Sequence, residues 1–400
     1  EAAKIFCWAE EDRILKEAKR DFCGMETELK DKCINARPDP FYTFACKDMI
    51  YVSVKPIIKC NLNCLYCNLG EKSNTSLCMS TVKDFFSFLV VKFPEEKINV
   101  RWSGGEPLLM GFDFFNSAVE WQKRLSSNFE NEISTNLTLL NEEYIRFFKK
   151  NNFSIYTSLD GIGSSHDFQR DGSFSLVRQA LINLRASGIP NVFINTTVTN
   201  HNVNALEKIY NLCLSLQYKW NFSVVVPSGI QKKQAEKLIV NPTDYSNKII
   251  KIFDKWANAK SPLGIQLFYD IVKYVLQKDG HIQKPQFSLG FDGNLYACHL
   301  LVGKPAYSLG KFINRSHFKW HSCDSCLYQR NEFSQCKNCY FDFLCNLNHC
   351  AFLYEVYADF PNLSNYLCSC FKPIYEHIVE CIKKYSMPKG GEKQWGMRRK

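Results

Sequence analysis

Strand-like and helix-like segments alternate six times between residues 51 and 227, and this alternation constrains the fold more than any other feature. Strands that alternate with helices form parallel sheets through crossover connections. Six repeats are two short of a closed eight-stranded barrel, so we predict an α/β fold with an open, partial (β/α)6 barrel. The expected strands are 51–57, 98–104, 132–136, 153–160, 192–199 and 220–227. The expected helices are 80–92, 112–125, 141–150, 175–188, 202–216, and two more near 243–258 and 265–278.

The sequence changes character near residue 285. FSLGFDGNLYACH is typical of a β-hairpin with its turn at 292–294, and short loops dense in cysteine follow. A last helix is expected from about 372 to 385. We therefore predict four regions. They are a helical segment (1–46), the partial barrel (47–284), a cysteine-rich domain (285–386) and a flexible basic tail (387–400).

Composition excludes several classes of protein. No run of about 18 apolar residues is present, so we expect no membrane span. The charged N-terminal stretch lacks the pattern of a signal peptide, and we expect a cytoplasmic protein. In such a chain, 19 cysteines indicate metal binding or redox chemistry rather than disulfides. The net charge of +10 is spread along the chain without a nucleic-acid-reading motif, so we expect no nucleic-acid partner.

Three cysteines, Cys60, Cys64 and Cys67, follow the first strand directly in the segment CNLNCLYC. Active sites on barrels of this kind lie at the carboxyl ends of the strands. Three thiolates can bind three irons of a [4Fe–4S] cluster and leave the fourth iron open to a small molecule. A zinc site completed by a distant residue, or buried cysteines without metal, are the alternatives.

CxxxCxxC with Tyr66 before the third cysteine resembles the signature of the radical S-adenosylmethionine (radical SAM) enzymes. The resemblance implies that S-adenosylmethionine chelates the open iron and is cleaved reductively to a 5′-deoxyadenosyl radical, which abstracts a substrate hydrogen. WSGGEPLL, STNLTLL, and SLDG with HDFQRDGSF resemble further motifs of that family at successive strand ends, over roughly residues 50–230. Taken singly, each could be an ordinary strand end, and SGGEP could be a turn with a helix-capping acid. The implied cofactor-binding residues are Tyr66, Gly104, Gly105, Glu106, Pro107, Thr135, Asn136, Ser158, Asp160 and Asn195.

The C-terminal cysteines resemble the SPASM domain, an extension of some radical SAM enzymes that carries two auxiliary [4Fe–4S] clusters. The resemblance implies one cluster on Cys336, Cys339, Cys345 and Cys368, and a second on Cys298, Cys323, Cys326 and Cys350. Two positions depart from the pattern: His349 stands where the fourth cysteine of the CKNCYFDFLC run is expected, and Arg315 stands where another cysteine is customary. Two zinc knuckles are the alternative, because paired CxxC motifs are a typical zinc spacing.

Radical SAM enzymes with this extension mostly modify peptides or proteins. Our leading hypothesis is maturation of a ribosomally made precursor peptide through a thioether or carbon–carbon crosslink. Residues 1–46 would then stand in the place of a leader-peptide-binding module, of which they are too short to be a complete copy. The charge favours an acidic precursor, and the reaction implies an external electron donor such as flavodoxin or ferredoxin.

Two alternatives stay open. One is a sulfatase-maturase-like oxidation of a protein serine or cysteine to formylglycine, and the other is a non-catalytic metal-binding adaptor. No catalytic residue is assigned, because Lys55, Arg170 and Asp171 could equally be structural. We expect Cys78, Cys213 and Cys381 to be buried or unreacted thiols.

Overall fold

The structure is a computed structural model of the 400-residue chain, and it describes residues 49–126, 128–259, 263–277, 286–313, 336, 339–341, 345 and 351–386. The predicted N-terminal helical segment (1–46) and basic tail (387–400) lie outside the described residues. So do Cys323, Cys326, Cys350, His349 and Arg315.

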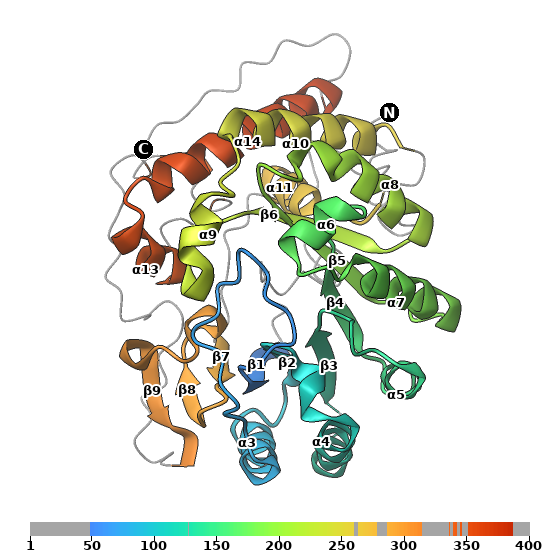
Figure 1. Cartoon of the computed structure of the whole chain (residues 1–400), viewed down its shortest axis with the longest axis vertical. Coiled ribbons are helices and arrows are strands. Elements are labelled where there is room, and N and C mark those ends of the chain that lie inside the picture. Colours follow the sequence, from blue (N-terminus) through green and yellow to red (C-terminus); the bar gives the residue numbers. More distant parts are fainter. Residues whose placement is uncertain are drawn as a thin grey trace.

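Six parallel strands lie side by side in chain order and form the barrel (Figure 1). In the described residues β6 forms one edge of the sheet and does not pair with β1, so the barrel is open, as predicted. The strands are β1 (Met49–Ile57), β2 (Lys97–Gly104), β3 (Phe129–Ser134), β4 (Ser154–Ser158), β5 (Val192–Val198) and β6 (Lys219–Val224).

Helices connect the strands and pack on their outer side. Local chemistry sets their ends: the Asn141 side chain caps the helix that follows it by accepting a hydrogen bond from the Tyr144 amide at 2.9 Å. That helix begins with glutamates and ends with lysines, as its dipole favours. The connecting helices are α3 (Met79–Lys92), α4 (Phe112–Leu125), α5 (Glu142–Lys150), α6 (Ser164–Gln169), α7 (Phe174–Ser187) and α8 (Leu206–Leu216).

Further helices follow β6, and several single turns lie between the larger elements. The α-helices are α9 (Lys232–Glu236), α10 (Pro242–Ala257), α11 (Gln266–Gln277), α13 (Ala351–Asp359) and α14 (Leu363–Ser386). The 3-10 turns are η2 (Pro107–Met110), η3 (Val203–Ala205), η4 (Gly229–Gln231), η5 (His299–Leu301) and η6 (Pro305–Tyr307). Among the helices described, none combines the length and apolarity that a membrane crossing requires.

Side chains alternate between the two faces of each strand and so divide the sheet into an apolar outer face and a polar inner face. Val54, Val100 and Trp102 are fully buried against the helices. The Trp102 ring packs edge-on against Phe86 and Phe115, with centroids 5.8 and 5.5 Å apart. Polar residues occupy the alternate positions and face the interior of the barrel, called the lumen below. They are Ser53, Lys55, Asn99, Arg101 and Glu132.

The predicted hairpin is present and joins the barrel sheet. β7 (Gln286–Leu289) pairs antiparallel with β8 (Asn294–Tyr296), which pairs with β9 (Ser308–Lys311). β7 also runs parallel to β1, with Tyr51 opposite Gln286, and this pairing was not predicted. The C-terminal region therefore extends the sheet on the side of β1, away from β6.

The last helix is longer than predicted. We expected it to begin near residue 372. Instead α14 begins at Leu363 and runs through Pro373. Its early residues, among them Leu363 and Leu367, are buried in the core, and this packing holds the helical backbone on both sides of the proline.

Candidate active site at the carboxyl ends of the strands

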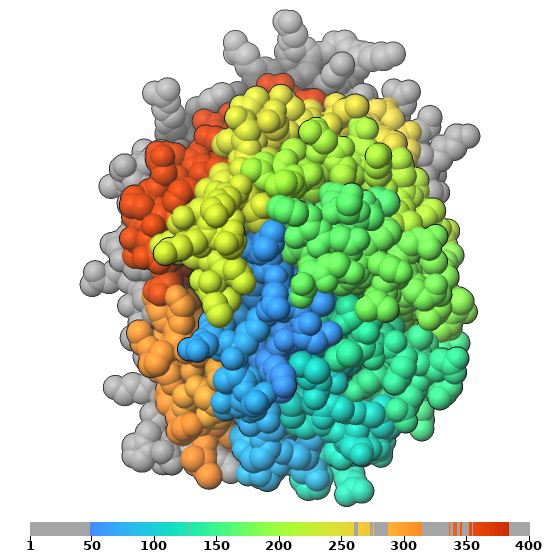
Figure 2. Space-filling model, viewed as in Figure 1, coloured from blue at the N-terminus to red at the C-terminus, as the bar shows by residue number. Residues whose placement is uncertain are grey.

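The three cysteines that follow β1 lie on a long segment, residues 58–78, called the cysteine loop below. The loop rises from the end of β1 toward α6 and α9 (Figure 1), and it is exposed between them on one face of the molecule (Figure 2). Cys64 is buried, whereas Cys60 and Cys67 are partly buried. Burial raises the pKa of Cys60 and of Cys64, and the charge of Cys67 adds to the rise in both. Thiols that influence one another in this way lie close together, and a group of three sulfur donors fits three ligands of a [4Fe–4S] cluster.

The glycine pair at the end of β2 lies directly against the cysteine loop. The Gly105 amide donates to the Ile57 carbonyl at 3.0 Å, and the Glu106 amide donates to the Lys59 carbonyl at 2.9 Å. A Cβ atom on Gly105 would lie 2.1 Å from the Lys59 oxygen, and one on Gly104 would lie 2.3 Å from the Ile57 oxygen. Gly104 also has a φ of +135°, which favours glycine. The two backbones can therefore meet only because neither residue has a side chain.

Glu106 joins the end of β2 to the end of β3. Its fully buried carboxylate accepts hydrogen bonds from the Leu108 amide (3.0 Å), the Thr135 hydroxyl (2.8 Å) and the Asn136 amide (2.7 Å). It caps η2, in which Pro107 takes the first position. Burial raises the pKa of Glu106 to about 7, and the three hydrogen bonds oppose that rise. Glu106 therefore caps a helix, as the alternative expectation for the SGGEP segment proposed.

The end of β3 contacts the loop through Asn136. The Asn136 side-chain amide donates to the side-chain oxygen Oδ1 of Asn61 at 2.9 Å and to the Cys60 sulfur at 3.9 Å. Asn61 in turn donates to the Thr138 hydroxyl at 2.7 Å. Asn136 was predicted as a site residue, whereas Asn61 and Thr138 were not. These bonds hold the part of the loop that carries the first cysteine.

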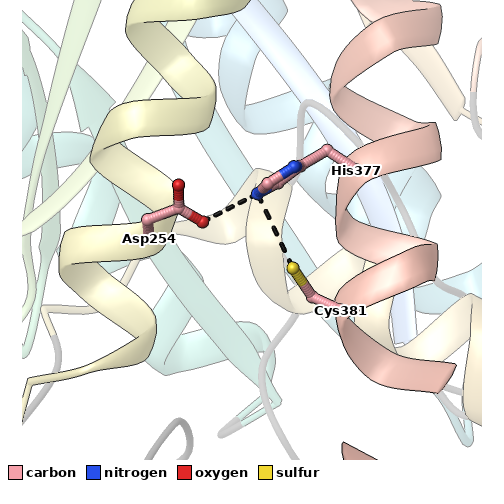
Figure 3. Close-up of side chains that lie close together, drawn as sticks. All are labelled: Asp254, His377 and Cys381. Atoms are coloured by element: carbon pink, nitrogen blue, oxygen red, sulfur yellow. Dashed lines mark hydrogen bonds and ion pairs between the residues drawn. The ribbon is translucent and has the colours of Figure 1, made fainter. Parts of the chain in front are cut away.

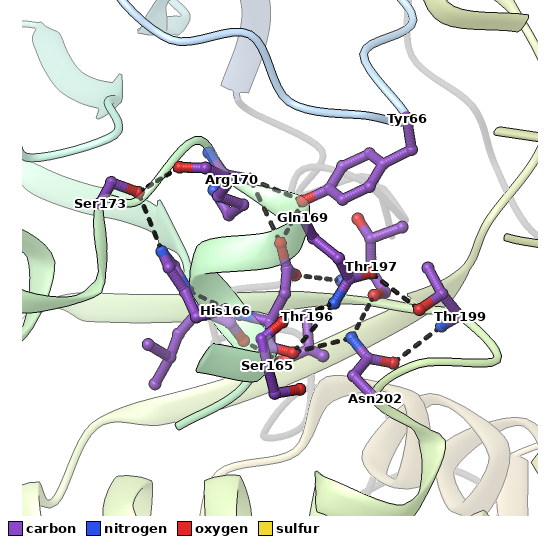
Figure 4. Close-up of polar contacts among 12 residues, drawn as sticks. Tyr66, Ser165, His166, Gln169, Arg170, Ser173, Thr196, Thr197, Thr199 and Asn202 are labelled. Atoms are coloured by element: carbon purple, nitrogen blue, oxygen red, sulfur yellow. Dashed lines mark hydrogen bonds and ion pairs between the residues drawn. The ribbon is translucent and has the colours of Figure 1, made fainter. Parts of the chain in front are cut away.

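Tyr66 and Arg170 lie side by side near α6 (Figure 4), and together with Asp160 they form a largely buried network. The Asp160 carboxylate accepts hydrogen bonds from the Tyr66 hydroxyl and, at 2.7 Å, from the Thr197 amide. Arg170 donates to the Tyr66 oxygen at 2.7 Å and lies 3.5 Å from Asp160. Burial raises the pKa of Asp160, and the positive charge of Arg170 opposes that rise. Asp160 and Tyr66 thereby connect the cysteine loop to the ends of β4 and β5.

The segment around α6 binds the loop by its backbone as well. The Leu65 amide donates to the Gln169 carbonyl, and the Asn63 amide donates to the Asp171 carboxylate, both at 3.0 Å. Gln169 is held in turn by the Thr199 hydroxyl at 2.7 Å. No site role was expected for Gln169 or Thr199, and their role follows only from the three-dimensional contact. Asp171, to which no catalytic role was assigned, makes a structural contact with the loop.

Ser158 and Asn195 are directly opposite each other in the pairing of β4 with β5. By strand alternation they share a face with Tyr156 and Phe193, whose rings stack 4.4 Å apart. This face is turned to the lumen, since the Arg101 guanidinium lies 4.2 Å from the centre of the Tyr156 ring. Both predicted residues therefore lie at the lumen side of the strand ends.

The lumen carries buried charges. Arg101 and Glu132 form an ion pair at 3.0 Å. Burial lowers the pKa of Lys55 to about 8 and that of His299 to about 3, although the charges of Cys298 and Cys67 raise the pKa of Lys55. A small cavity lies among Tyr51, Ser53, Asn99, Arg101, Ser288 and His299. This interior can receive polar groups rather than purely apolar ones.

The structure describes five of the C-terminal cysteines proposed as ligands. Cys336 is buried, and the amide of Cys339 donates to its carbonyl at 3.0 Å. Burial raises the pKa of Cys368, on α14, and Cys339 lies close enough for its charge to add to that rise. Two members of the first proposed ligand set therefore lie together although they are distant in sequence. Cys298 lies near Lys55 and hence near the lumen, while its three proposed co-ligands lie outside the described residues.

Comparisons of sequence show which proteins this chain is similar to. Residues 54–213 match the family described as the Radical SAM superfamily. A serine-type anaerobic sulfatase-maturating enzyme of Bacteroides thetaiotaomicron is 28% identical over 378 residues, covering 82% of this chain and 89% of that enzyme. A cysteine-type anaerobic sulfatase-maturating enzyme of Clostridium novyi is 27% identical over 355 residues, covering 80% of this chain and 92% of the relative.

Comparisons of structure agree with the fold. The structure of anSMEcpe with bound AdoMet and the Cp18Cys peptide superposes with a TM-score of 0.64 at 20% identity, covering 84% of this chain and 99% of that one. Streptococcus suis SuiB bound to its precursor peptide SuiA gives a TM-score of 0.58 at 13% identity, covering 79% and 73%. At these identities the likeness establishes the fold alone.

Proposed function

The chain is a radical SAM enzyme, and from this premise we propose that it oxidises a serine or cysteine side chain of a protein or peptide to formylglycine. The observation that supports this proposal is the extent of the alignment. The sulfatase-maturating enzymes align over 89% and 92% of their own length, which extends well beyond the barrel domain. This ranks the oxidation ahead of the crosslinking reaction that we favoured from the sequence.

We assign the cluster to Cys60, Cys64 and Cys67, with S-adenosylmethionine completing the coordination. Together these groups would supply a radical that takes a hydrogen atom from the substrate. The protein contributes the position of the loop, which is fixed by Gly105 on one side and by Asp160 on the other. The remaining residues assigned to cofactor binding are Tyr66, Gly104, Glu106, Pro107, Thr135, Asn136, Ser158 and Asn195.

A serine reaches the aldehyde directly, whereas a cysteine gives a thioaldehyde that water hydrolyses to the aldehyde with release of hydrogen sulfide. In both cases the substrate loses a proton and an electron after the hydrogen atom is taken. The C-terminal cysteines are candidates to hold groups that accept this electron. We propose one auxiliary cluster on Cys336, Cys339, Cys345 and Cys368. We propose the second on Cys298, Cys323, Cys326 and Cys350. The nearness of Cys298 to Lys55 supports a location of the second cluster beside the lumen.

A second candidate is the crosslinking of a ribosomally made precursor peptide. The likeness to SuiB, which was solved with its precursor peptide, favours keeping this candidate. The net charge of +10 is also suited to an acidic peptide.

The test is anaerobic turnover with S-adenosylmethionine, a strong reductant and peptides from a sulfatase active site that carry either serine or cysteine at the target position. We expect 5′-deoxyadenosine together with a peptide product that reacts with a hydrazide. Serine oxidation and crosslinking both remove two hydrogens, so the hydrazide reaction rather than the mass distinguishes them.

The Cys64→Ala variant is the control and should form neither product. A peptide that loses two hydrogens but does not react with hydrazide would favour crosslinking. Absence of 5′-deoxyadenosine from the cluster-loaded protein would contradict the assignment of the cluster to Cys60, Cys64 and Cys67.

A further inference from the structure

A group of three potential metal ligands lies outside the active site, where α10 packs against α14 (Figure 3). His377 and Cys381 are four residues apart on α14 and therefore lie on the same face of that helix. Asp254 approaches them from α10. Their donor atoms all lie within 4.8 Å of one another. We had expected Cys381 to be a buried or unreacted thiol, and the sequence alone does not reveal its neighbours.

Both neighbours of His377 approach the same ring nitrogen. The Asp254 Oδ1 lies 2.7 Å from Nε2, and the Cys381 sulfur lies 3.6 Å from that same atom. A nucleophile activated by a histidine and an acid needs its two partners on opposite ring nitrogens. The arrangement here excludes such a relay, because one nitrogen cannot receive a proton from the thiol while it donates to the carboxylate. The three donor atoms instead lie close enough together to be ligands of one metal ion.

The ligands are held by rigid elements. The Phe253 ring lies edge-on to the His377 ring with centroids 5.9 Å apart, and Phe253 itself is buried. Ile374 and Ile378, on either side of His377, are fully buried. The Asp254 side chain is 50% exposed, so an ion and a water molecule can reach the group from solvent.

The ligand types favour zinc. Zn²⁺ binds thiolate, imidazole and carboxylate together in a tetrahedron, whereas Mg²⁺ and Ca²⁺ prefer oxygen ligands. With Zn–S of about 2.3 Å and Zn–N of about 2.0 Å, a tetrahedral site separates sulfur from nitrogen by about 3.5 Å. The observed 3.6 Å between Cys381 and His377 agrees with that spacing. The 2.7 Å between Asp254 and the imidazole is shorter than the spacing of two ligands on one zinc ion, so metal binding requires the exposed Asp254 carboxylate to move away from the ring.

We propose that Asp254, His377 and Cys381 form a zinc site, with water as the fourth ligand, that joins α14 to α10. The site is separate from the proposed oxidation chemistry and does not depend on it. Its effect would be to fix the helix that carries Cys368 against the barrel domain.

The test measures zinc bound to the full, anaerobically cluster-loaded chain after addition of one equivalent of zinc, with iron determined in the same samples. We expect zinc binding to weaken by more than about tenfold in Cys381→Ser and in His377→Gln, while the iron content stays the same. The exposed cysteine variant Cys78→Ser is the matched control and should bind zinc like the wild type. X-ray absorption at the zinc edge should show one sulfur ligand with nitrogen and oxygen ligands.

Thermal unfolding gives a second readout. Zinc should raise the melting temperature of the wild type and of Cys78→Ser, but not that of Cys381→Ser. Equal zinc binding in wild type and Cys381→Ser, or an absorption spectrum with several sulfur ligands, would overturn the proposal. Several sulfur ligands would mean that zinc occupies cluster cysteines instead.

Discussion

At the scale of single residues, contacts between backbones decide where the cysteine loop lies. Gly105 meets the Lys59 carbonyl without a side chain between them, and the Glu106 amide binds that same carbonyl. Because Cys60 follows Lys59 directly, any displacement of this contact moves a proposed cluster ligand. The glycine is required here by the space available rather than by flexibility.

We predict that Gly105→Ala displaces the loop and lowers formation of 5′-deoxyadenosine by about 100-fold, the effect expected when reacting groups are misplaced by about 1 Å. The measurement is 5′-deoxyadenosine release under strong reductant, with the change in the cluster's EPR spectrum on adding S-adenosylmethionine. Gly70→Ala, in the same loop, is the control, because a Cβ there meets nothing within 4 Å. Wild-type activity in Gly105→Ala would show that the loop adapts to the added methyl group.

His166 is a buried residue whose protonation opposes folding. Its Nδ1 accepts a hydrogen bond from the Asp160 amide at 3.2 Å, and its Nε2 lies 3.0 Å from the Ser173 hydroxyl. Burial, reinforced by the charge of Arg170, lowers its pKa from 6.5 to about 3. The unfolded chain therefore takes up a proton near pH 6.5 that the folded chain takes up only near pH 3, and stability falls as the pH falls through this window.

We predict that lowering the pH from about 7 to about 5.5 destabilises the wild type by about 1 kcal/mol more than it destabilises His166→Asn. Urea unfolding of both proteins at the two pH values measures this difference. Glu106 acts in the opposite direction: its raised pKa of about 7 means that the folded protein becomes less stable as the pH rises from 4.5. Both proteins contain Glu106, so the comparison between them cancels this contribution. Equal pH dependence of the two proteins would contradict the prediction.

At the scale of elements, α14 shows how packing overrides local preference. Pro373 lacks an amide hydrogen and disfavours the interior of a helix, yet the helix continues on both sides of it. The early turns contribute Leu363 and Leu367 to the core, and the late turns contribute Ile374 and Ile378. Burial of both halves against the domain offsets the cost of the proline.

Replacement of Pro373 by alanine should raise the free energy of unfolding by about 1–3 kcal/mol, because it restores the missing hydrogen bond and a good helix former. Denaturant unfolding measures the change. Pro242→Ala is the matched control: Pro242 stands in the first turn of α10, where proline is favourable, so no gain is expected. A loss of stability in Pro373→Ala would indicate that a bend at the proline is needed for packing.

The order of strands and helices could be predicted from the sequence because hydrophobic alternation and helix-capping residues are local signals. The positions of Cys60, Asn136 and Asp160 at strand ends followed from that order. The pairing of β7 with β1 and the contacts of Gln169 with Thr199 could not, because they join segments that only the folded chain brings together. Glu106 marks a further limit, since a glutamate beside a glycine pair suits a helix cap and a cofactor site equally well.

At the scale of the whole molecule, the excess of positive charge bears on the substrate. The net charge of +10 creates a field that attracts acidic chains over a distance of several ångströms in low salt. For an acidic peptide this field would add to binding, without specifying the residue that is modified.

We predict that an acidic substrate peptide binds at least about tenfold more weakly at 0.5 M than at 0.05 M salt, because the Debye length falls below about 5 Å. Fluorescence anisotropy of a labelled peptide measures the affinity. A peptide with its acids replaced by amides is the control and should bind with little dependence on salt. The same affinity for the acidic peptide at both salt concentrations would show that charge has no part in recognition.

The parallel pairing of β1 with β7 has a consequence for biosynthesis. While the ribosome is making the chain, residues 286–289 emerge long after β1, so the unpaired edge of β1 stays open to other polypeptides during most of translation. A nascent chain that ends before residue 286 contains the whole CNLNCLYC segment, but the edge of β1 that normally pairs with β7 is still unpaired. Shortened expression fragments of this chain are therefore expected to aggregate.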